Sequence, residues 1–124
     1  MRFAFICLGG AAGSGARYLV GMWATRALGQ AFPYGTLIVN AVGSFLAVIV
    51  MVLSIHKGLV SEDFRFFLVT GVMGGFTTYS AFNYETLSLF NAGTPGLAAL
   101  NIAATVVCCL IAGGLAFLLM RLVG

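Results

Sequence analysis

The residues from Gly71 to Phe82 combine side-chain and backbone types that can bind an ion inside a membrane. They read Gly-Val-Met-Gly-Gly-Phe-Thr-Thr-Tyr-Ser-Ala-Phe and interrupt a segment otherwise apolar enough to cross a bilayer. This composition predicts a break in the helix. Non-helical backbone at membrane depth persists only where protein or a water-filled cavity satisfies its N–H and C=O groups, so such a break usually marks an ion or substrate site. Transport is therefore the first hypothesis.

Aromatic and hydroxyl side chains follow the predicted break. Tyr79 and Phe82 are three residues apart and would share a helical face, with the hydroxyls of Thr78 and Ser80 nearby. Aromatic pairs at this spacing usually serve core packing. Glu85 is the one acid well inside the predicted bilayer. It is either a buried site residue or a group near the membrane surface with its charge in water.

Three further polar features lie in apolar segments. Arg17 either faces a protein interior or water, as a functional residue would, or snorkels to the nearer membrane surface. Asn40 either bonds to a neighbouring helix or donates its N–H groups to an anion. Asn101, Thr105 and Cys109 repeat every fourth residue, a line that suits either interhelical hydrogen bonding or one wall of a pore.

The composition places these groups in an integral membrane protein. Hydrophobic residues make up 61% of the 124 residues and charged residues 7%, against about 25% charged residues in soluble domains. The basic residues are scattered, so the sequence indicates neither a nucleic-acid site nor an anionic-lipid patch. Each crossing needs about 20 apolar residues, so the chain can form four crossings and little else. A pore would then be shared between subunits, and we expect a homo-oligomer.

The elements that must position the polar groups form a single all-α membrane domain over residues 1–124. We expect helices over residues 3–28, 36–55, 64–89 and 95–121, the third broken at mid-membrane. Gly9, Gly13, Arg17 and Gly21 recur every fourth position on the first helix, a small-residue stripe typical of close helix packing. The basic residues favour cytoplasmic termini, although they are few enough to allow a mixed orientation.

Three sequence fragments, at matching spacing, resemble the Fluc/CrcB fluoride channel family. They are Gly9-Gly-Ala-Ala-Gly-Ser-Gly-Ala-Arg17-Tyr18, Gly35-Thr-Leu-Ile-Val-Asn40-Ala-Val-Gly43-Ser-Phe45, and the segment from Gly71 to Phe82 with Glu85. The resemblance spans the first three crossings in order. The fourth crossing matches mostly by hydrophobicity.

The resemblance implies a passive channel that exports toxic cytoplasmic fluoride across the cell inner membrane and so confers fluoride resistance. It implies a dual-topology homodimer of two antiparallel subunits with two fluoride pores. Some family members instead pair two homologous subunits. The resemblance also implies a structural Na⁺ ion at the dimer centre, held by backbone carbonyls at the positions of Gly74 and Thr77.

The family's pore residues match positions of this chain one by one. The pore asparagine matches Asn40, and the paired pore phenylalanines match Tyr79 and Phe82. Hydroxyls along the pore match Ser80 and Thr105. In addition, Arg17 matches the basic residue of the anion-accessible vestibule. The chain departs from the usual Thr-Thr-Phe-Ser-Thr-Phe motif at Tyr79, which adds a hydroxyl, and at Ala81, which lacks one. Both departures bear on the conduction rate rather than on the fold.

Two other classes fit the sequence less well. A small proton-coupled multidrug-type exporter also has four short helices, but it would be expected to place a carboxylate in its first helix, where this chain has only Arg17. A non-transporting scaffold would explain the glycines but not the polar cluster. No nucleophile–base set, metal cluster or phosphate loop indicates an enzyme.

Overall fold

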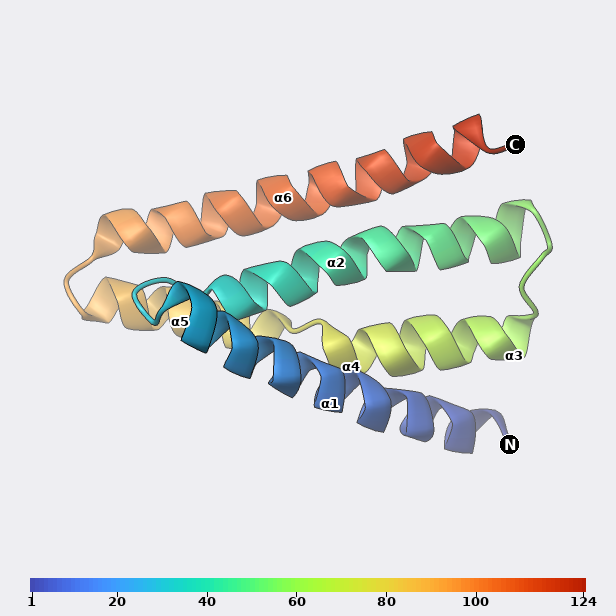
Figure 1. The fold of residues 1–124 in the computed structure, drawn as a ribbon, viewed down its shortest axis with the longest axis horizontal. Helices are drawn as coiled ribbons and strands as arrows, with labels where there is room; N and C mark the ends of the chain where they lie inside the picture. The colour runs from blue at the N-terminus through green and yellow to red at the C-terminus, as the bar shows by residue number, and fades with distance from the viewer.

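A computed structural model describes all residues 1–124 as helices joined by short turns, without a strand. In chain order the elements are α1 (Arg2–Leu28), α2 (Tyr34–Met51), the π-helical turn η1 (Val52–His56), α3 (Glu62–Arg65), η2 (Phe66–Met73), α4 (Gly74–Phe76), α5 (Tyr79–Asn91) and α6 (Pro95–Leu122). The second crossing is α2 with η1. The third runs from α3 through η2 and α4 to α5 (Figure 1).

Three of these helices are long and apolar enough to cross a membrane: Arg2–Leu28, Tyr34–His56 and Pro95–Leu122. Only 15 of 124 residues are buried, so most large apolar side chains face outward, as they do in a protein whose solvent is lipid. The all-helical fold class and the membrane setting that the sequence predicts are confirmed.

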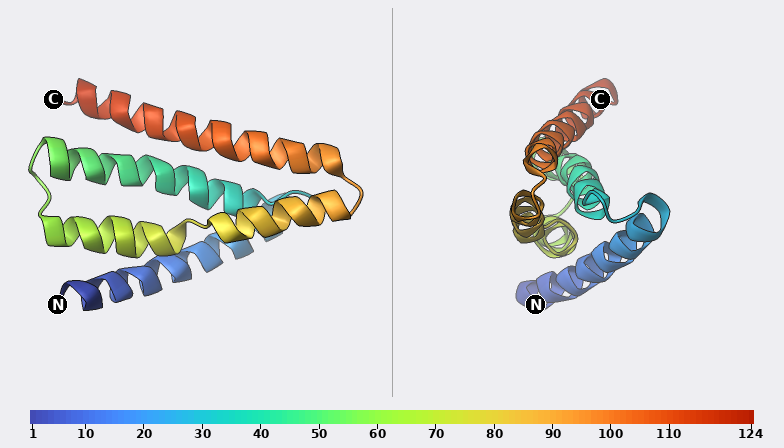
Figure 2. Two further views of the ribbon diagram at one scale, coloured as in Figure 1. Left: turned by 180° about the vertical axis from the view of Figure 1, so that it is seen from behind. Right: turned by 90° about the vertical axis from the view of Figure 1, so that its left-hand side faces the viewer.

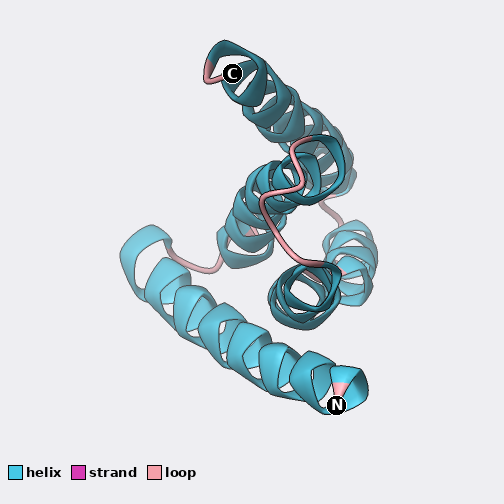
Figure 3. Cartoon of the chain, turned by 90° about the vertical axis from the view of Figure 1, so that its right-hand side faces the viewer, coloured by secondary structure: helices cyan, strands magenta, loops and turns pink.

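The chain runs up and down between two ends. Both termini and the turn after η1 lie at one end, and the two other turns lie at the opposite end (Figures 1 and 2). α2 packs along α6, α1 packs along η2 and α4, and α5 packs against α6. The first and fourth crossings therefore form opposite edges of the molecule, which the end-on view makes plain (Figure 3).

Glycines bring the first and third crossings into backbone contact. A Cβ added at Gly9 would lie 2.6 Å from the Phe67 carbonyl oxygen, and one added at Gly13 would overlap the Val72 carbonyl. From the other side, a Cβ at Gly71 would lie 2.9 Å from the Ile6 carbonyl oxygen. The small-residue stripe thus serves close packing at these positions, as the sequence indicates.

The break in the third crossing lies at two threonines rather than at the glycines. Gly71, Gly74 and Gly75 are helical. The chain leaves the helix at Thr77 (φ −84°, ψ 156°) and Thr78 (φ −153°, ψ 118°), both in extended conformations. The break predicted between Gly71 and Phe82 is confirmed and lies at Thr77 and Thr78. Gly71 and Gly75 instead allow the close approach of α1.

The residue types at the helix ends suit their positions, with one exception at Thr94. The Ser61 hydroxyl accepts a hydrogen bond from the Phe64 N–H at 3.4 Å, and Gly58 has a positive φ of 63° just after the second crossing. Thr94 immediately precedes α6 and is a residue type common at helix N-caps, but its side chain does not cap that helix. It donates to the Leu89 carbonyl at 2.7 Å instead.

Candidate functional site

The Asn40 side chain holds the backbone of the break. Its Nδ2 donates to the Thr78 carbonyl at 3.0 Å, and its Oδ1 accepts from the Thr78 N–H at 2.8 Å. The backbone N–H can only donate, so the amide orientation is fixed. A single side chain on α2 therefore satisfies both backbone groups of Thr78, which membrane hydrocarbon could not satisfy. We call these two hydrogen bonds the Asn40–Thr78 pair.

This pair releases a carbonyl on the first half of the third crossing. In a continuous α-helix the Thr78 N–H would donate to the carbonyl four residues earlier, that of Gly74. The Thr77 N–H still donates to Met73 at 2.9 Å, and the Thr77 hydroxyl donates to the same carbonyl at 2.8 Å. The helix therefore lacks the hydrogen bond from Thr78 to Gly74, which leaves the carbonyl of the exposed residue Gly74 without its usual donor.

The second half of the third crossing, helix α5, begins with a capped N-terminus. The Thr78 hydroxyl accepts from the Ala81 N–H at 3.2 Å and lies 3.3 Å from the Ser80 hydroxyl. The first N–H groups of an α-helix have no helical acceptor and carry partial positive charge. α5 is 13 residues long, so its start is an electropositive point beside the Asn40 amide, which keeps one free N–H.

A groove of about 420 Å³ connects these groups. It opens to the outside of the chain and is lined by α2, the third crossing and α6. Its polar lining comprises Asn40 and Ser44 from α2, Thr77 and Thr78 from the break, and Thr105 from α6. The Thr105 hydroxyl oxygen is buried and has no hydrogen-bond partner within the chain. The groove thus presents amide, hydroxyl and backbone groups, and no ionised side chain.

Two aromatic rings stand at the break. The ring centroids of Tyr79 and Phe82 are 5.6 Å apart with a tilt of 58° between the ring planes. Tyr79 lines the groove and is 78% exposed, whereas Phe82 is half-buried. Tilted pairs place one ring's electropositive edge toward a neighbour.

Most residues singled out from the sequence come together here. Asn40, Gly74, Thr77, Tyr79 and Thr105 line the one groove. Ser80 reaches it through the Thr78 hydroxyl, and Phe82 through the Tyr79 ring.

Arg17 stays apart from this group within one chain. It is half-buried on α1 and does not line the groove. It makes no ion pair either, since the ion pairs of the molecule involve Arg2 and Arg65 at the α3 end.

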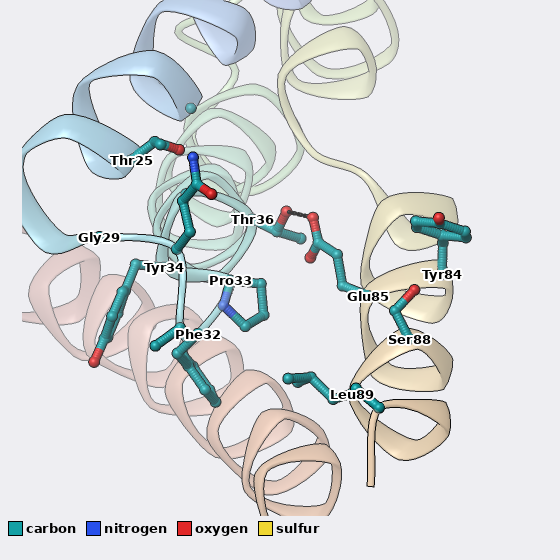
Figure 4. A pocket seen from close by; sticks show the side chains of 15 residues that line it. Thr25, Gly29, Phe32, Pro33, Tyr34, Thr36, Tyr84, Glu85, Ser88 and Leu89 are labelled. Carbon is teal, nitrogen blue, oxygen red and sulfur yellow. Dashed lines mark hydrogen bonds between the residues drawn. The ribbon is translucent and has the colours of Figure 1, made fainter. Parts of the chain in front are cut away.

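A second cavity of about 450 Å³ lies at the end of the bundle opposite the termini, between the turn before α2 and the α5 helix (Figure 4). Glu85 points into it from α5 and accepts a hydrogen bond from the Thr36 hydroxyl of α2 at 2.7 Å. The other carboxylate oxygen of Glu85 is buried without a partner in the chain. Glu85 is therefore partly buried and lines a cavity at one end of the bundle.

The sequence analysis did not identify the main structural role of Thr78. It named the Thr78 hydroxyl, but the backbone groups of this residue carry the contact to Asn40. For Asn101 the sequence offered interhelical hydrogen bonding as one alternative, which the bond to Thr86 realises, but it did not identify Thr86 as the partner. A break requires some partner for its backbone, and Asn40 was the one membrane amide on the preceding helix, a signal that could have suggested the pair.

Comparison with known proteins gives a consistent result. Residues 4–117 match the model of the family described as CrcB-like protein, Camphor Resistance (CrcB). The chain is 56% identical over 120 residues to a protein of Anaeromyxobacter sp. (strain K) named fluoride-specific ion channel FluC, covering 97% of this chain and 95% of that protein. Proteins of the same name from Agrobacterium fabrum and Thermus thermophilus are 49% and 48% identical, over 86% and 80% of this chain and 86% and 77% of their own lengths.

Proposed function

The chain belongs to the CrcB family, a family of ion channels and not of enzymes, and we propose that it is a passive, fluoride-selective channel that lets cytoplasmic fluoride leave the cell. The observation that carries this proposal is the groove at the Asn40–Thr78 pair. It gathers donors suited to a small anion at mid-membrane. The protein would act as a multi-pass protein of the cell inner membrane and protect against fluoride toxicity.

The groove's chemistry suits an ion that must both enter and leave. The free Asn40 N–H, the Thr105 and Ser80 hydroxyls and the edges of the Tyr79 and Phe82 rings can together replace part of a fluoride ion's water shell. None of these groups carries a full positive charge, so none would trap the anion. Conduction needs this balance between binding and release.

Electrical driving force is sufficient for export. HF crosses lipid, ionises in the more neutral cytoplasm and is trapped there as the anion. An inside-negative potential of 100 mV drives each exiting fluoride ion with about 2.3 kcal/mol. A passive pathway therefore suffices, provided that it excludes chloride, whose leak would collapse the potential.

The open side of the groove supports a dimer. Tyr79 is 78% exposed, and the polar groove opens outward, where lipid would leave its groups unsatisfied. We propose that a second, antiparallel copy covers this face, giving a dual-topology homodimer with two pores; two homologous subunits in opposite orientations would serve equally. Arg17 would line the vestibule of such an assembly.

The break also fits a structural Na⁺ ion between the two copies. Hard cations take oxygen ligands, and no group of three or more His, Cys, Asp or Glu side chains is placed to hold a metal ion. The Gly74 carbonyl, freed by the Asn40–Thr78 pair, lies with Thr77 at the electronegative end of the first half of the third crossing. Gly74 and Thr77 would hold the ion through backbone oxygens, and a bound ion would fix the two breaks together.

Sodium removal should therefore weaken the assembly. With Na⁺ replaced by N-methyl-D-glucamine, we expect a lower apparent melting temperature of the detergent-solubilised dimer. At a Na⁺ concentration of 100 times its Kd, bound ion would contribute about 2.7 kcal/mol. The check is a thermal unfolding series at constant ionic strength. A melting temperature independent of Na⁺ would count against the site.

The function itself is tested by efflux from liposomes containing the purified protein. We expect fast fluoride efflux with negligible chloride efflux when valinomycin and a K⁺ gradient set the potential, and no need for a proton gradient. Absence of fluoride efflux from a folded dimer would remove the channel proposal. Movement of drug-like cations that requires a proton gradient would instead support the exporter alternative.

A further inference from the structure

One buried hydrogen bond joins α6 to the helix that carries the aromatic pair. Asn101 on α6 is 1% exposed, and its Nδ2 donates to the Thr86 hydroxyl of α5 at 2.9 Å. It is the one hydrogen bond that a side chain of α6 makes with another helix. All other contacts of α6 are packing contacts, which allow sliding more readily than a directional bond does.

A second hydrogen bond links Thr86 to the backbone of Phe82. The Thr86 hydroxyl donates its single hydrogen to the Phe82 carbonyl at 2.7 Å, and so accepts the Asn101 N–H on a free lone pair. A chain of two hydrogen bonds therefore runs from α6 to the turn of α5 that holds Phe82. Hydrogen bonds linked in this way in a low-dielectric interior strengthen each other.

The face of α6 that carries Asn101 also carries Thr105. Asn101 and Thr105 are four residues apart and lie on one face of α6, both buried. Thr105 lines the groove with a hydroxyl oxygen that has no partner in the chain. A shift of α6 along α5 would therefore move this hydroxyl relative to the break.

We propose that the Asn101–Thr86 hydrogen bond positions the fluoride pathway: it fixes the turn of α5 that carries Phe82 relative to the Thr105 hydroxyl, which lines the groove. The proposal rests on the proposed function, in which both groups contact the ion. Asn101 and Thr86 are then positioning residues that act through their neighbours. The alternative is that this bond only glues two helices together.

Three variants distinguish a positioning role of this hydrogen bond from a purely structural role in holding the two helices together. Thr86→Val keeps the shape but removes the hydroxyl, so the Asn101 amide is left buried without an acceptor. Thr86→Ser keeps the hydroxyl and is the rescue control. The double variant with Asn101→Leu and Thr86→Val removes both polar groups, which relieves the unsatisfied amide and should restore thermal stability.

The measurement is fluoride efflux from liposomes beside the melting temperature of each variant. We expect Thr86→Val to lower both, with efflux reduced at least about fivefold, which corresponds to about 1 kcal/mol. Thr86→Ser should keep most of the rate. The double variant should recover its melting temperature but not its efflux. Recovery of both would show that the bond only glues the helices, and an unchanged rate in Thr86→Val would equally overturn the proposal.

A second readout does not depend on conduction. A single 4-fluorophenylalanine at position 82 reports the ring environment by ¹⁹F NMR. We expect one resonance in the parent protein and a shifted or split resonance in both Thr86→Val and the double variant. An identical spectrum in all three proteins would overturn the positioning proposal even where efflux is reduced. If the variants shift the resonance but the parent protein conducts no fluoride, the failure lies in the proposed function and not in the positioning of Phe82.

Discussion

Replacing Asn40 with aspartate will abolish fluoride efflux. The carboxylate can still accept the Thr78 N–H, but it cannot donate to the Thr78 carbonyl, and it places a negative charge in the groove. Two like charges about 4 Å apart repel by about 4 kcal/mol at an effective dielectric constant of about 20, which is nearly a thousandfold in rate. Efflux from liposomes, normalised to folded protein, measures the loss.

The matched control carries the same charge outside the groove. Leu59 is 73% exposed in the turn between the second and third crossings, so Leu59→Asp should conduct at the parental rate. Size-exclusion profiles of both variants separate a blocked path from a misfolded protein. Fluoride efflux at the parental rate in Asn40→Asp would place Asn40 outside the path.

Valine at Gly13 will prevent α1 from docking on the third crossing. An added Cβ at this position would overlap the Val72 carbonyl and lie 2.9 Å from the Phe76 backbone nitrogen. Both obstacles are backbone atoms, which cannot swing aside as a side chain can. We expect a loss of about 3 kcal/mol or more, the upper end for overpacking. The readouts are a monodisperse detergent-solubilised peak and the melting temperature.

Gly15 provides the comparison on the same helix. A Cβ added there meets no atom within 4 Å, so Gly15→Val tests valine in α1 without the steric conflict and should fold. Equal behaviour of the two variants, folded or unfolded, would contradict the assignment of Gly13 to a backbone contact.

The sequence was sufficient for the fold class because lipid constrains it so strongly. Apolar length predicts helices, and the stripe at Gly9 and Gly13 predicts a close contact. The exact location of the helix break was harder to predict. Glycine weakens helices in water, but in lipid its missing side chain also permits packing, so Gly71 and Gly75 could indicate either outcome. Only the packed neighbours decide between them.

The site was predictable as a set of residues but not as a set of contacts. Spacing places Asn40 on the small, polar face of its helix, yet it cannot tell which groups lie across from that face. The amide was expected either to bond another helix or to offer both N–H groups to an anion. In the structure one N–H bonds the third crossing while the other stays free. The same limit hid the contact between Asn101 and Thr86.

The Asn40–Thr78 pair has a consequence for how the protein is made. Its two residues are 38 positions apart, and synthesis proceeds from the N-terminus. When the ribosome delivers the third crossing, the helix with Asn40 has already emerged. Each unpaired peptide group of the break would cost several kcal/mol in hydrocarbon. These groups thus enter the bilayer after the Asn40 amide, which supplies both their acceptor and their donor, is already present there. In the reverse order of helices, the same final structure would demand that a bare break persist in lipid until its partner was translated.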